Sequence, residues 1–313
     1  MNIAIIEIYA VKKMNLHNAI DAHLRNSVIL SKYFNCDLLV TESDFIKSFK
    51  KKYDVLILGY ASGYAPFKSI NKLIELNPKA YKYVLSNEYN IAPSIAKFHP
   101  YYLIANYEKK YKTNKIIKQY FLNLNLLFSR NCNEINNKKY DCIYYGTFRI
   151  NRSKYFTEYL QNNIYLSTSS KNYKKFKHVN CNPIFIQKLK WNKYKETLNN
   201  FKYQLYIEDD YTHNNFNNLA NRWYEAGFCN NVVFFDVNCR NTINKSELQY
   251  YQDQVANYIV ESYEDLQNKI KECNKDFEKH LAIQKSWRLN EDYLRENMLK
   301  ELKEIIYKNT NNG

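Results

Sequence analysis

An arginine and a glutamate lie three residues apart in the segment Tyr206–Asp236, YIEDDYTHNNFNNLANRWYEAGFCNNVVFFD. The pattern predicts a strand that ends at Ile207, an acidic and asparagine-rich loop, a helix of about three turns and a buried strand over 232–235. Arg222 and Glu225 would share one face near the start of this helix. An arginine there can clamp phosphate, and a carboxylate can accept hydrogen bonds from a sugar diol. The alternative is an exposed ion pair between the two side chains.

The turn YGTFR, Tyr145–Arg149, is a second candidate site element, because it directly follows an expected apolar strand over 140–145. Gly146 would let the backbone approach a ligand closely, and Thr147 offers a hydroxyl and an amide. In a doubly wound sheet this turn and the helix with Arg222 meet at the carboxyl edge, where Arg149 and Arg222 could neutralise a departing diphosphate. No GxGxxG motif accompanies the turn, so a dinucleotide is not indicated.

Strands and helices alternate along the chain. Strands are expected at 2–9, 36–41, 54–59, 81–86, 140–145, 164–167, 232–235 and 257–261. Helices are expected at 18–34, 67–76, 153–160, 194–201, 263–273, 275–288 and 293–307. The stretch Arg130–Lys139 is polar almost throughout and indicates a domain boundary. The alternation predicts an α/β protein with two parallel-sheet domains.

The chain of 313 residues carries 46 Lys and Arg against 31 Asp and Glu, a formal charge of +15. This excess favours a polyanionic partner such as DNA or RNA. AT-rich coding is the alternative explanation, since the chain is also rich in Asn, Ile and Tyr and has only 5 Gly and 5 Pro. Basic runs at 50–52, 109–118 and 171–177 have tyrosines in or beside them and suit phosphate contacts. The DNA-binding candidates chosen from them are Lys50, Lys51, Lys110 and Lys112.

Several classes of protein are disfavoured by composition. The 7 cysteines are scattered, with no CxxC and no zinc-like spacing with histidine, which predicts free thiols and no structural metal. No apolar run approaches the roughly 18 residues that span a bilayer. The N-terminus, MNIAIIEIYAV, lacks the pattern of a signal peptide. We therefore expect a cytoplasmic protein without a membrane partner.

The chain resembles the DNA β-glucosyltransferases of T-even bacteriophages, which are GT-B glycosyltransferases. The resemblance covers most of the chain and is most specific at YDCIYYGTFR and YIEDDYTHNNFNNLANRWYEA. The opening MNIAIIEI and the later HLAIQKSW, followed by a closing helix, are also similar to the family. It implies two Rossmann-like parallel-sheet domains that face a central cleft, with the C-terminal helix crossing back to the first domain. The acceptor (DNA) domain would be 1–135 completed by 290–313, and the nucleotide-sugar donor domain would be 136–289.

The resemblance also implies roles for the residues at the two motifs. Gly146, Thr147 and Arg149 match residues that contact the diphosphate of the donor. Arg222 matches an arginine on the phosphates, and Glu225 matches a glutamate on the ribose. These five residues form the core of the expected donor site.

Three further donor contacts follow from the resemblance at positions where this sequence departs from the family pattern. A second family arginine past the turn would fall at Ser153, and Arg152 lies one residue earlier, so Arg152 is taken as the candidate. Asp209 and Asp210 are the expected sugar contacts, in a loop that differs from that of the family.

The catalytic base is expected in the first domain. An inverting transfer needs a carboxylate to take the proton of the acceptor hydroxyl. The family places an aspartate just after a strand, and the aligned position here is Asn87, which cannot act as a base. Glu88 is next to it and is the chosen candidate, with Asp21 and His99 as alternatives.

The sequence therefore indicates a transferase that moves a sugar, glucose by analogy, from a UDP-sugar to a hydroxymethylated pyrimidine in phage DNA. The base would be flipped out of the duplex into the cleft. The alternative acceptor is a lipid, a polysaccharide or a protein. A non-catalytic nucleic-acid-binding protein would not need Arg149, Arg222 and Glu225 together. The UDP-sugar is a co-substrate, no cofactor is bound permanently, and Mg²⁺ or Mn²⁺ could assist diphosphate release. We expect a monomer that acts on double-stranded DNA in the cytoplasm of an infected bacterial host.

Overall fold

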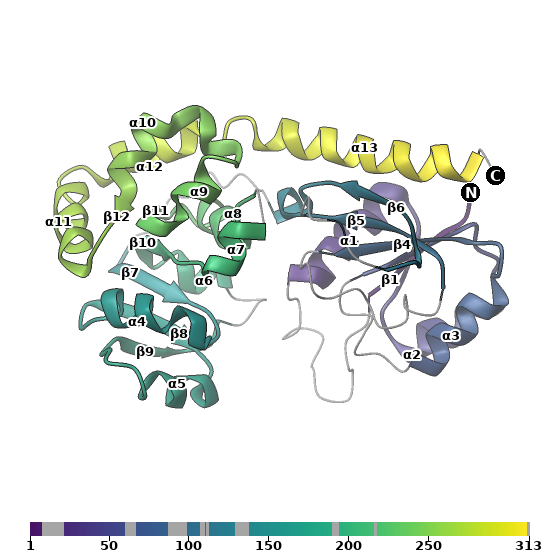
Figure 1. Cartoon of the computed structure of the whole chain (residues 1–313), viewed down its shortest axis with the longest axis horizontal. Coiled ribbons are helices and arrows are strands. Elements are labelled where there is room, and N and C mark those ends of the chain that lie inside the picture. Colours follow the sequence, from purple (N-terminus) through teal and green to yellow (C-terminus); the bar gives the residue numbers. More distant parts are fainter. Residues whose placement is uncertain are drawn as a thin grey trace. The chain divides into compact units, whose positions relative to one another are not determined.

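Two compact units make up the chain. The computed structural model describes residues 1–7, 22–59, 67–86, 99–106, 110, 113–128, 138–189, 194–215 and 218–311. The first unit consists of Met1–Phe128 together with Tyr293–Gly313, and the second of Ser129–Asp292. Each unit contains a six-stranded parallel sheet (Figure 1).

The first unit has its strands in the order β2-β1-β3-β4-β5-β6. The strands are β1 (Ile3–Ile6), β2 (Asp37–Leu39), β3 (Val55–Leu58), β4 (Tyr81–Ser86), β5 (Tyr101–Ala105) and β6 (Ile116–Phe121). The helices are α1 (Ala22–Phe34), α2 (Glu42–Ser48) and α3 (Phe67–Leu76), and a 3-10 turn covers Leu124–Phe128. Every residue of β1 and β3 is buried, as expected for inner strands of a parallel sheet that is covered on both faces.

The C-terminal helix α13 (Glu291–Asn311) completes the first unit. It lies along the sheet beside β5 and β6 (Figure 1), and Met298, Leu299, Leu302 and Ile306 are the buried apolar residues of the helix. Tyr83 on β4 donates a hydrogen bond to the carbonyl of Ile306 at 3.4 Å. Tyr120 on β6 contacts the side-chain amide of Asn309, with 3.0 Å between Nδ2 and the tyrosine oxygen. These contacts join the two ends of the chain in one unit.

The second unit has the strand order β12-β11-β10-β7-β8-β9, and all neighbouring strands are parallel. The strands are β7 (Tyr140–Tyr145), β8 (Ile164–Thr168), β9 (Ile184–Gln187), β10 (Phe201–Tyr206), β11 (Val232–Asp236) and β12 (Ile259–Val260). The helices are α4 (Ser153–Tyr159), α5 (Ser170–Phe176), α6 (Tyr194–Leu198), α7 (Asp210–Asn215), α8 (Asn221–Phe228), α9 (Arg240–Ile243), α10 (Gln252–Val255), α11 (Tyr263–Cys273) and α12 (Phe277–Ser286). The direction of strand order reverses between β7 and β10, which is the position where open α/β sheets bind ligands.

A buried glutamine holds helix α12 on the second sheet. Strand β12 pairs only with the last two residues of β11, so Val233 lacks a strand partner on that side. Gln284 accepts from the Val233 amide at 2.8 Å and donates to its carbonyl at 2.9 Å. Its side chain thus satisfies backbone groups that would otherwise be buried without a hydrogen bond.

The architecture confirms the predicted α/β class with two parallel-sheet domains. Among the helices in the described part of the chain, none is long and apolar enough to cross a membrane. The six cysteines that the structure describes form no disulfide, as their scattered positions predict.

Candidate functional site

The carboxyl edge of the second sheet brings the two sequence motifs together. The turn 146–149 follows β7, and Glu208 and Asp209 follow β10, the neighbouring strand across the switch point. Helix α8 begins at Asn221, where the amide of Ala220 donates to the hydroxyl of Tyr206 at 2.8 Å. This bond ties the start of α8 to the end of β10, so the first turn of the helix lies against the same edge.

Arg222 is turned toward the end of β10. Its Nη1 donates to the carbonyl of Ile207 at 2.8 Å and lies 3.2 Å from Oε1 of Glu208. The guanidinium carbon is 5.6 Å from the ring centroid of Tyr144, and the side chain is 16% exposed. Burial lowers the pKa of Arg222, but the Glu208 carboxylate outweighs this effect and the pKa is raised. The side chain is therefore a fixed cation that remains partly accessible.

Glu225 is buried, with 2% of its surface exposed. Its Oε2 accepts a hydrogen bond of 2.6 Å from Tyr145, the last residue of β7. Gln204 donates to the hydroxyl of Tyr145 at 3.4 Å and to the carbonyl of Arg222 at 3.1 Å. Burial and the charge of Glu225 raise the pKa of Tyr145 well above its ordinary value, so Tyr145 stays a hydrogen-bond donor. The alternative of an exposed Arg222–Glu225 ion pair is wrong, because Arg222 pairs with Glu208 and the buried Glu225 accepts from Tyr145.

Arg152 lies at the same edge but is already engaged. Its Nη2 is 2.6 Å from Oε2 of Glu208, and its Nε is 3.0 Å from Oδ2 of Asp209. The three side chains are only 5%, 3% and 1% exposed, in that order. Arg152 and Arg222 thus hold Glu208 from two sides, and the charges of this cluster balance. A phosphate contact by Arg152 stays a prediction, and in this geometry it requires Arg152 to leave a carboxylate.

Asp209 caps helix α7 besides pairing with Arg152. Its Oδ1 accepts from the amide and the hydroxyl of Thr212 at 3.0 and 3.1 Å. Asp210, the second expected sugar contact, is 69% exposed and accepts from Tyr155 at 3.0 Å. The sugar contacts of both aspartates stay predictions, and of the two only Asp210 presents its carboxylate to solvent.

The pairing of Asp209 predicts a loss of stability in acid. Burial raises its pKa, but Arg152 and the bonds from Thr212 outweigh this, so its pKa lies below the ordinary 3.8. Since the folded pKa is the lower one, its contribution is complete above about pH 4 and is lost as the pH falls through the folded value. We expect the urea midpoint of the Asp209→Asn variant to fall less between pH 5 and pH 2 than that of the wild type. Equal acid dependence of the two proteins would contradict the assignment.

The turn after β7 is anchored by its phenylalanine. The ring of Phe148 lies 5.8 Å from that of Phe156 and 5.1 Å from that of Phe176. The residues on either side, Thr147 and Arg149, are exposed. A Cβ on Gly146 would come within 3.2 Å of the Tyr144 hydroxyl, so the glycine fits a tight position. Among the described residues Arg149 forms no ion pair, and it is the exposed cation of the turn.

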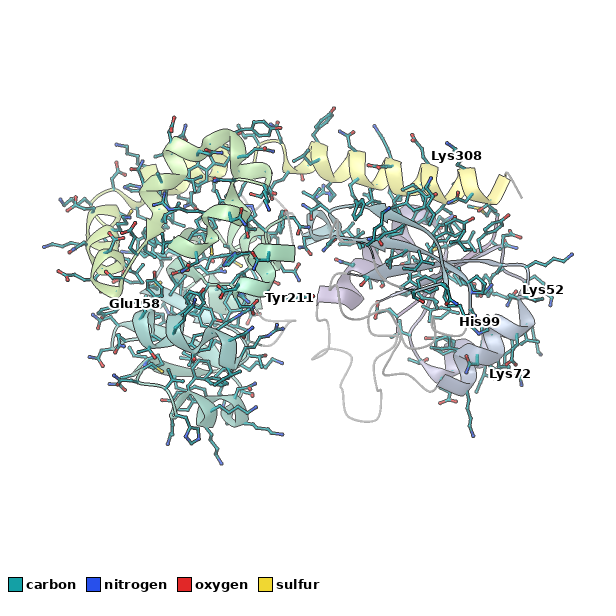
Figure 2. All side chains as sticks on the ribbon, viewed as in Figure 1. Lys52, Lys72, His99, Glu158, Tyr211 and Lys308 are labelled. Atoms are coloured by element: carbon teal, nitrogen blue, oxygen red, sulfur yellow. The ribbon has the colours of Figure 1, made fainter. Side chains whose placement is uncertain are left out.

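The candidates for the catalytic base in the first unit lie either outside the described residues or away from the carboxyl edge of the sheet. Glu88, with Asn87 and the alternative Asp21, lies outside the described residues. His99, labelled in Figure 2, precedes β5 and therefore lies at the amino edge of the sheet, opposite the edge that binds ligands in this class. Its pKa is lowered, first by burial and then by Lys82.

The lysines chosen as DNA contacts have mixed positions. Lys50 and Lys51 precede β3 and also lie at the amino edge, and Lys51 pairs with Asp37 at 2.7 Å. Lys110 is exposed in the connection between β5 and β6, and Lys112 lies outside the described residues. Their DNA contacts stay predictions.

Three buried residues at the carboxyl edges were not singled out from the sequence. Tyr145 and Glu208 orient the donor-site candidates, and their position at the carboxyl ends of β7 and β10 was an available signal. In the first unit, Glu7 follows β1 and is 1% exposed, and its Oε2 accepts from Ser27 at 3.1 Å. A Cβ on Gly59 would lie 1.6 Å from that oxygen, so the carboxylate occupies the space over a glycine at the end of β3.

Solved structures of T4 phage β-glucosyltransferase are similar to this chain over nearly its whole length. The structure in complex with UDP and Mn²⁺ has a TM-score of 0.71 at 17% identity and covers 98% of this chain and 99% of that one. The structure with its UDP-glucose substrate has a TM-score of 0.74 at 16% identity, with coverage of 98% and 99%. The fold is GT-B-like. No protein-family model and no curated protein matches the sequence.

A third structure describes the DNA-modifying enzyme β-glucosyltransferase in the presence and absence of uridine diphosphoglucose. It has a TM-score of 0.70 at 16% identity and again covers 98% of this chain and 99% of that one. At these identities the likeness concerns the fold. At that level it confirms the resemblance seen in the sequence.

Proposed function

We propose that this protein is a glycosyltransferase that moves a sugar from a UDP-sugar to a hydroxymethylated pyrimidine in DNA. The observation that carries the proposal is the meeting of Arg222, Glu225 and the turn 146–149 at the switch point of the second sheet. A phosphate-binding cation, a carboxylate and an exposed arginine at one sheet edge are the groups that a nucleoside diphosphate requires. The fold shared with T4 phage β-glucosyltransferase supports the same assignment.

The donor half of the reaction assigns a task to each of these groups. Arg222 and Arg149 would bind the diphosphate and neutralise the charge that grows on it as the bond to the sugar breaks. Glu225 would accept hydrogen bonds from the ribose hydroxyls, since a carboxylate can take several donors and Tyr145 fixes its orientation. Glu208 would hold Arg222 in place, and Arg152 would hold Glu208 from its other side.

The acceptor half follows the sequence prediction. A carboxylate takes the proton of the acceptor hydroxyl, the oxygen attacks C1 of the sugar, and UDP leaves from the opposite side. Glu88 is the proposed base. DNA is supported as acceptor by the formal charge of +15.

Divalent cations need a separate test of fit. Glu208 and Asp209 after β10 are bonded to arginines, and Asp236 at the end of β11 accepts from Tyr159 at 2.7 Å. In the described ranges no group of three or more His, Cys, Asp or Glu is arranged to hold a metal ion. Glu208, Asp209 and Asp236 are thus already engaged by protein groups, and no step is assigned to a cation.

Two measurements test the proposal. UDP should raise the melting temperature, since a ligand at 100 times its Kd stabilises the folded state by about 2.7 kcal/mol. Labelled sugar should pass from the UDP-sugar to hydroxymethylated DNA and not to unmodified DNA of the same sequence. A melting temperature unmoved by any nucleotide would contradict the donor site. A shift with UDP but no transfer to hydroxymethylated DNA would contradict only the acceptor.

A further inference from the structure

The carboxyl edge of the second sheet is divided by charge. Strands β7, β8 and β9 are neighbours, and each is followed within four residues by an exposed cation. These cations are Arg149, Lys171 and Lys188. The half of the edge that lies beyond β7 is therefore basic.

The other half of the edge is acidic. Strand β10 is followed by Glu208 and Asp209, β11 ends at Asp236, and β12 is followed by Glu261. Arg152 and Arg222 neutralise the first two, and Glu261 lies 3.6 Å from Arg240. The switch point thus separates a basic half from an acidic half in which Glu208, Asp209 and Glu261 have arginine partners.

Two of these cations, Lys171 and Lys188, lie in a long stretch without acidic residues. No Asp or Glu occurs between Glu158 and Glu196, whereas lysines occur at 171, 174, 175, 177, 188, 190, 193 and 195. Glu158, labelled in Figure 2, accepts from the backbone amide of Tyr263 at 3.0 Å. We call the five exposed lysines that the structure describes here the basic surface: Lys171, Lys174, Lys175, Lys177 and Lys188. Within the described ranges none of the five forms an ion pair.

Helix α5 carries part of the basic surface and is packed against the sheet next to the donor-site candidate. Phe176 on α5 is 1% exposed and meets Phe148 of the turn, at 5.1 Å between ring centroids. Tyr173 stacks on Phe185 of β9, with centroids 4.2 Å apart and an angle of 24° between the rings. Figure 1 shows α5 beside β8 and β9 at this end of the sheet. The helix is thus held on the sheet by its aromatic residues.

The spacing of the lysines on α5 destabilises the helix by repulsion, and exposure to solvent alone gives no reason for such a spacing. Lys171, Lys174 and Lys175 are separated by three and four residues, so they share one face of α5. Like charges at such spacing destabilise a helix by about 0.2–0.5 kcal/mol per pair. A solvated face with alternating signs would avoid this repulsion. A polyanion on the surface would remove it.

We propose that the basic surface binds the phosphate backbone of double-stranded DNA, beside the site that receives the sugar donor. Strands β8 and β9, about 4.8 Å apart, and a helix with a rise of about 1.5 Å per residue give a surface of roughly 5 Å by 10 Å. B-DNA carries one charge per about 1.7 Å of its axis, so this surface spans several phosphates. The proposal rests on DNA as the acceptor in the proposed function and gives that acceptor a contact on the donor unit.

The test compares two variants with equal loss of charge. In the first, Lys171, Lys174, Lys175 and Lys177 are replaced by glutamine. In the control, four exposed lysines of the same unit are replaced by glutamine: Lys245, Lys271, Lys275 and Lys279. Fluorescence anisotropy with an unmodified duplex measures Kd at several salt concentrations from about 50 to about 200 mM. Over this range, affinity that depends on phosphate contacts changes strongly. Stabilisation by UDP, measured in parallel, shows that the second unit is folded and should be equal in both variants.

We expect the first variant to bind DNA about tenfold or more weakly than the control. The slope of log Kd against log salt should fall by about 2 to 3, since each phosphate contact contributes about 0.9. Equal Kd and equal slope in the two variants would overturn the proposal. The proposal would also be overturned if the first variant bound DNA as well as the control does but no longer bound vesicles of anionic phospholipid. Binding of unmodified DNA involves no sugar transfer, so a chain without transferase activity can still show the loss of DNA binding. The test therefore separates this inference from the proposed function.

Discussion

Replacing Arg222 with lysine should lower kcat/KM for the UDP-sugar by about 100-fold or more, since one lost donor to a developing negative charge typically costs a factor of 10²–10³. Lysine keeps the charge but loses the planar fork that grips two phosphate oxygens. It also loses the geometry that holds Arg222, with Nη1 at 2.8 Å from the carbonyl of Ile207. Steady-state kinetics with varied UDP-sugar measures the effect.

The matched control is Arg240→Lys in the same unit. The side chain of Arg240 is 54% exposed and lies 3.6 Å from Glu261. Exposed pairs of this kind contribute about 0–1 kcal/mol, so the control should keep its rate and its stabilisation by UDP. If Arg222→Lys behaves like the control in both measurements, Arg222 serves only to hold Glu208.

The regular elements of the fold were predictable because apolar periodicity is a local signal. Helix Phe67–Leu76, strand Tyr81–Ser86 and helix Tyr263–Cys273 begin and end at the residues expected from the sequence. Their apolar residues lie on long, uninterrupted patterns. In such segments burial and propensity agree.

Several of the elements that were missed are short, and strands β5 and β6 were missed as well. The sequence prediction had no helix at 42–48, although Thr41 and Asp44 form a capping box there. Helix α7 occupies part of the expected acidic loop, with Asp209 as its cap. Strand β9 was also missed, because it lies at the sheet edge and half of its residues are exposed. Elements of this length depend on tertiary contacts more than on their own pattern.

The sequence predicted which residues belong to the candidate site, but not which of them form hydrogen bonds and ion pairs with one another. Arg222 and Glu225 on one helix face followed from helical spacing. The bond from Tyr145 to Glu225 spans 80 residues, and that from Arg152 to Asp209 spans 57. The parallel order of β7 and β10 creates these contacts, and no local pattern encodes which strand lies beside which.

Replacing Arg152 with methionine decides between its two roles. In the structure Arg152 is the buried countercharge of Asp209, whereas the sequence motif indicates a phosphate contact. Breaking a buried ion pair by removing one partner typically costs about 3–5 kcal/mol, because a charge remains without compensation. Glu208 keeps Arg222 as a partner, so the effect should centre on Asp209. We expect the free energy of unfolding of the second unit to fall by about 3 kcal/mol or more.

The measurement can be confined to the second unit. All 3 tryptophans, Trp191, Trp223 and Trp287, belong to it, so urea denaturation followed by tryptophan fluorescence reports on this unit. The rescue variant Arg152→Met with Asp209→Asn removes both charges, and an asparagine can still cap α7. Its stability should return most of the way to that of the wild type, because neutral groups leave no buried charge. A stable Arg152→Met protein that no longer responds to UDP would instead place Arg152 on the phosphates, and Asp209→Asn would then leave that response unchanged.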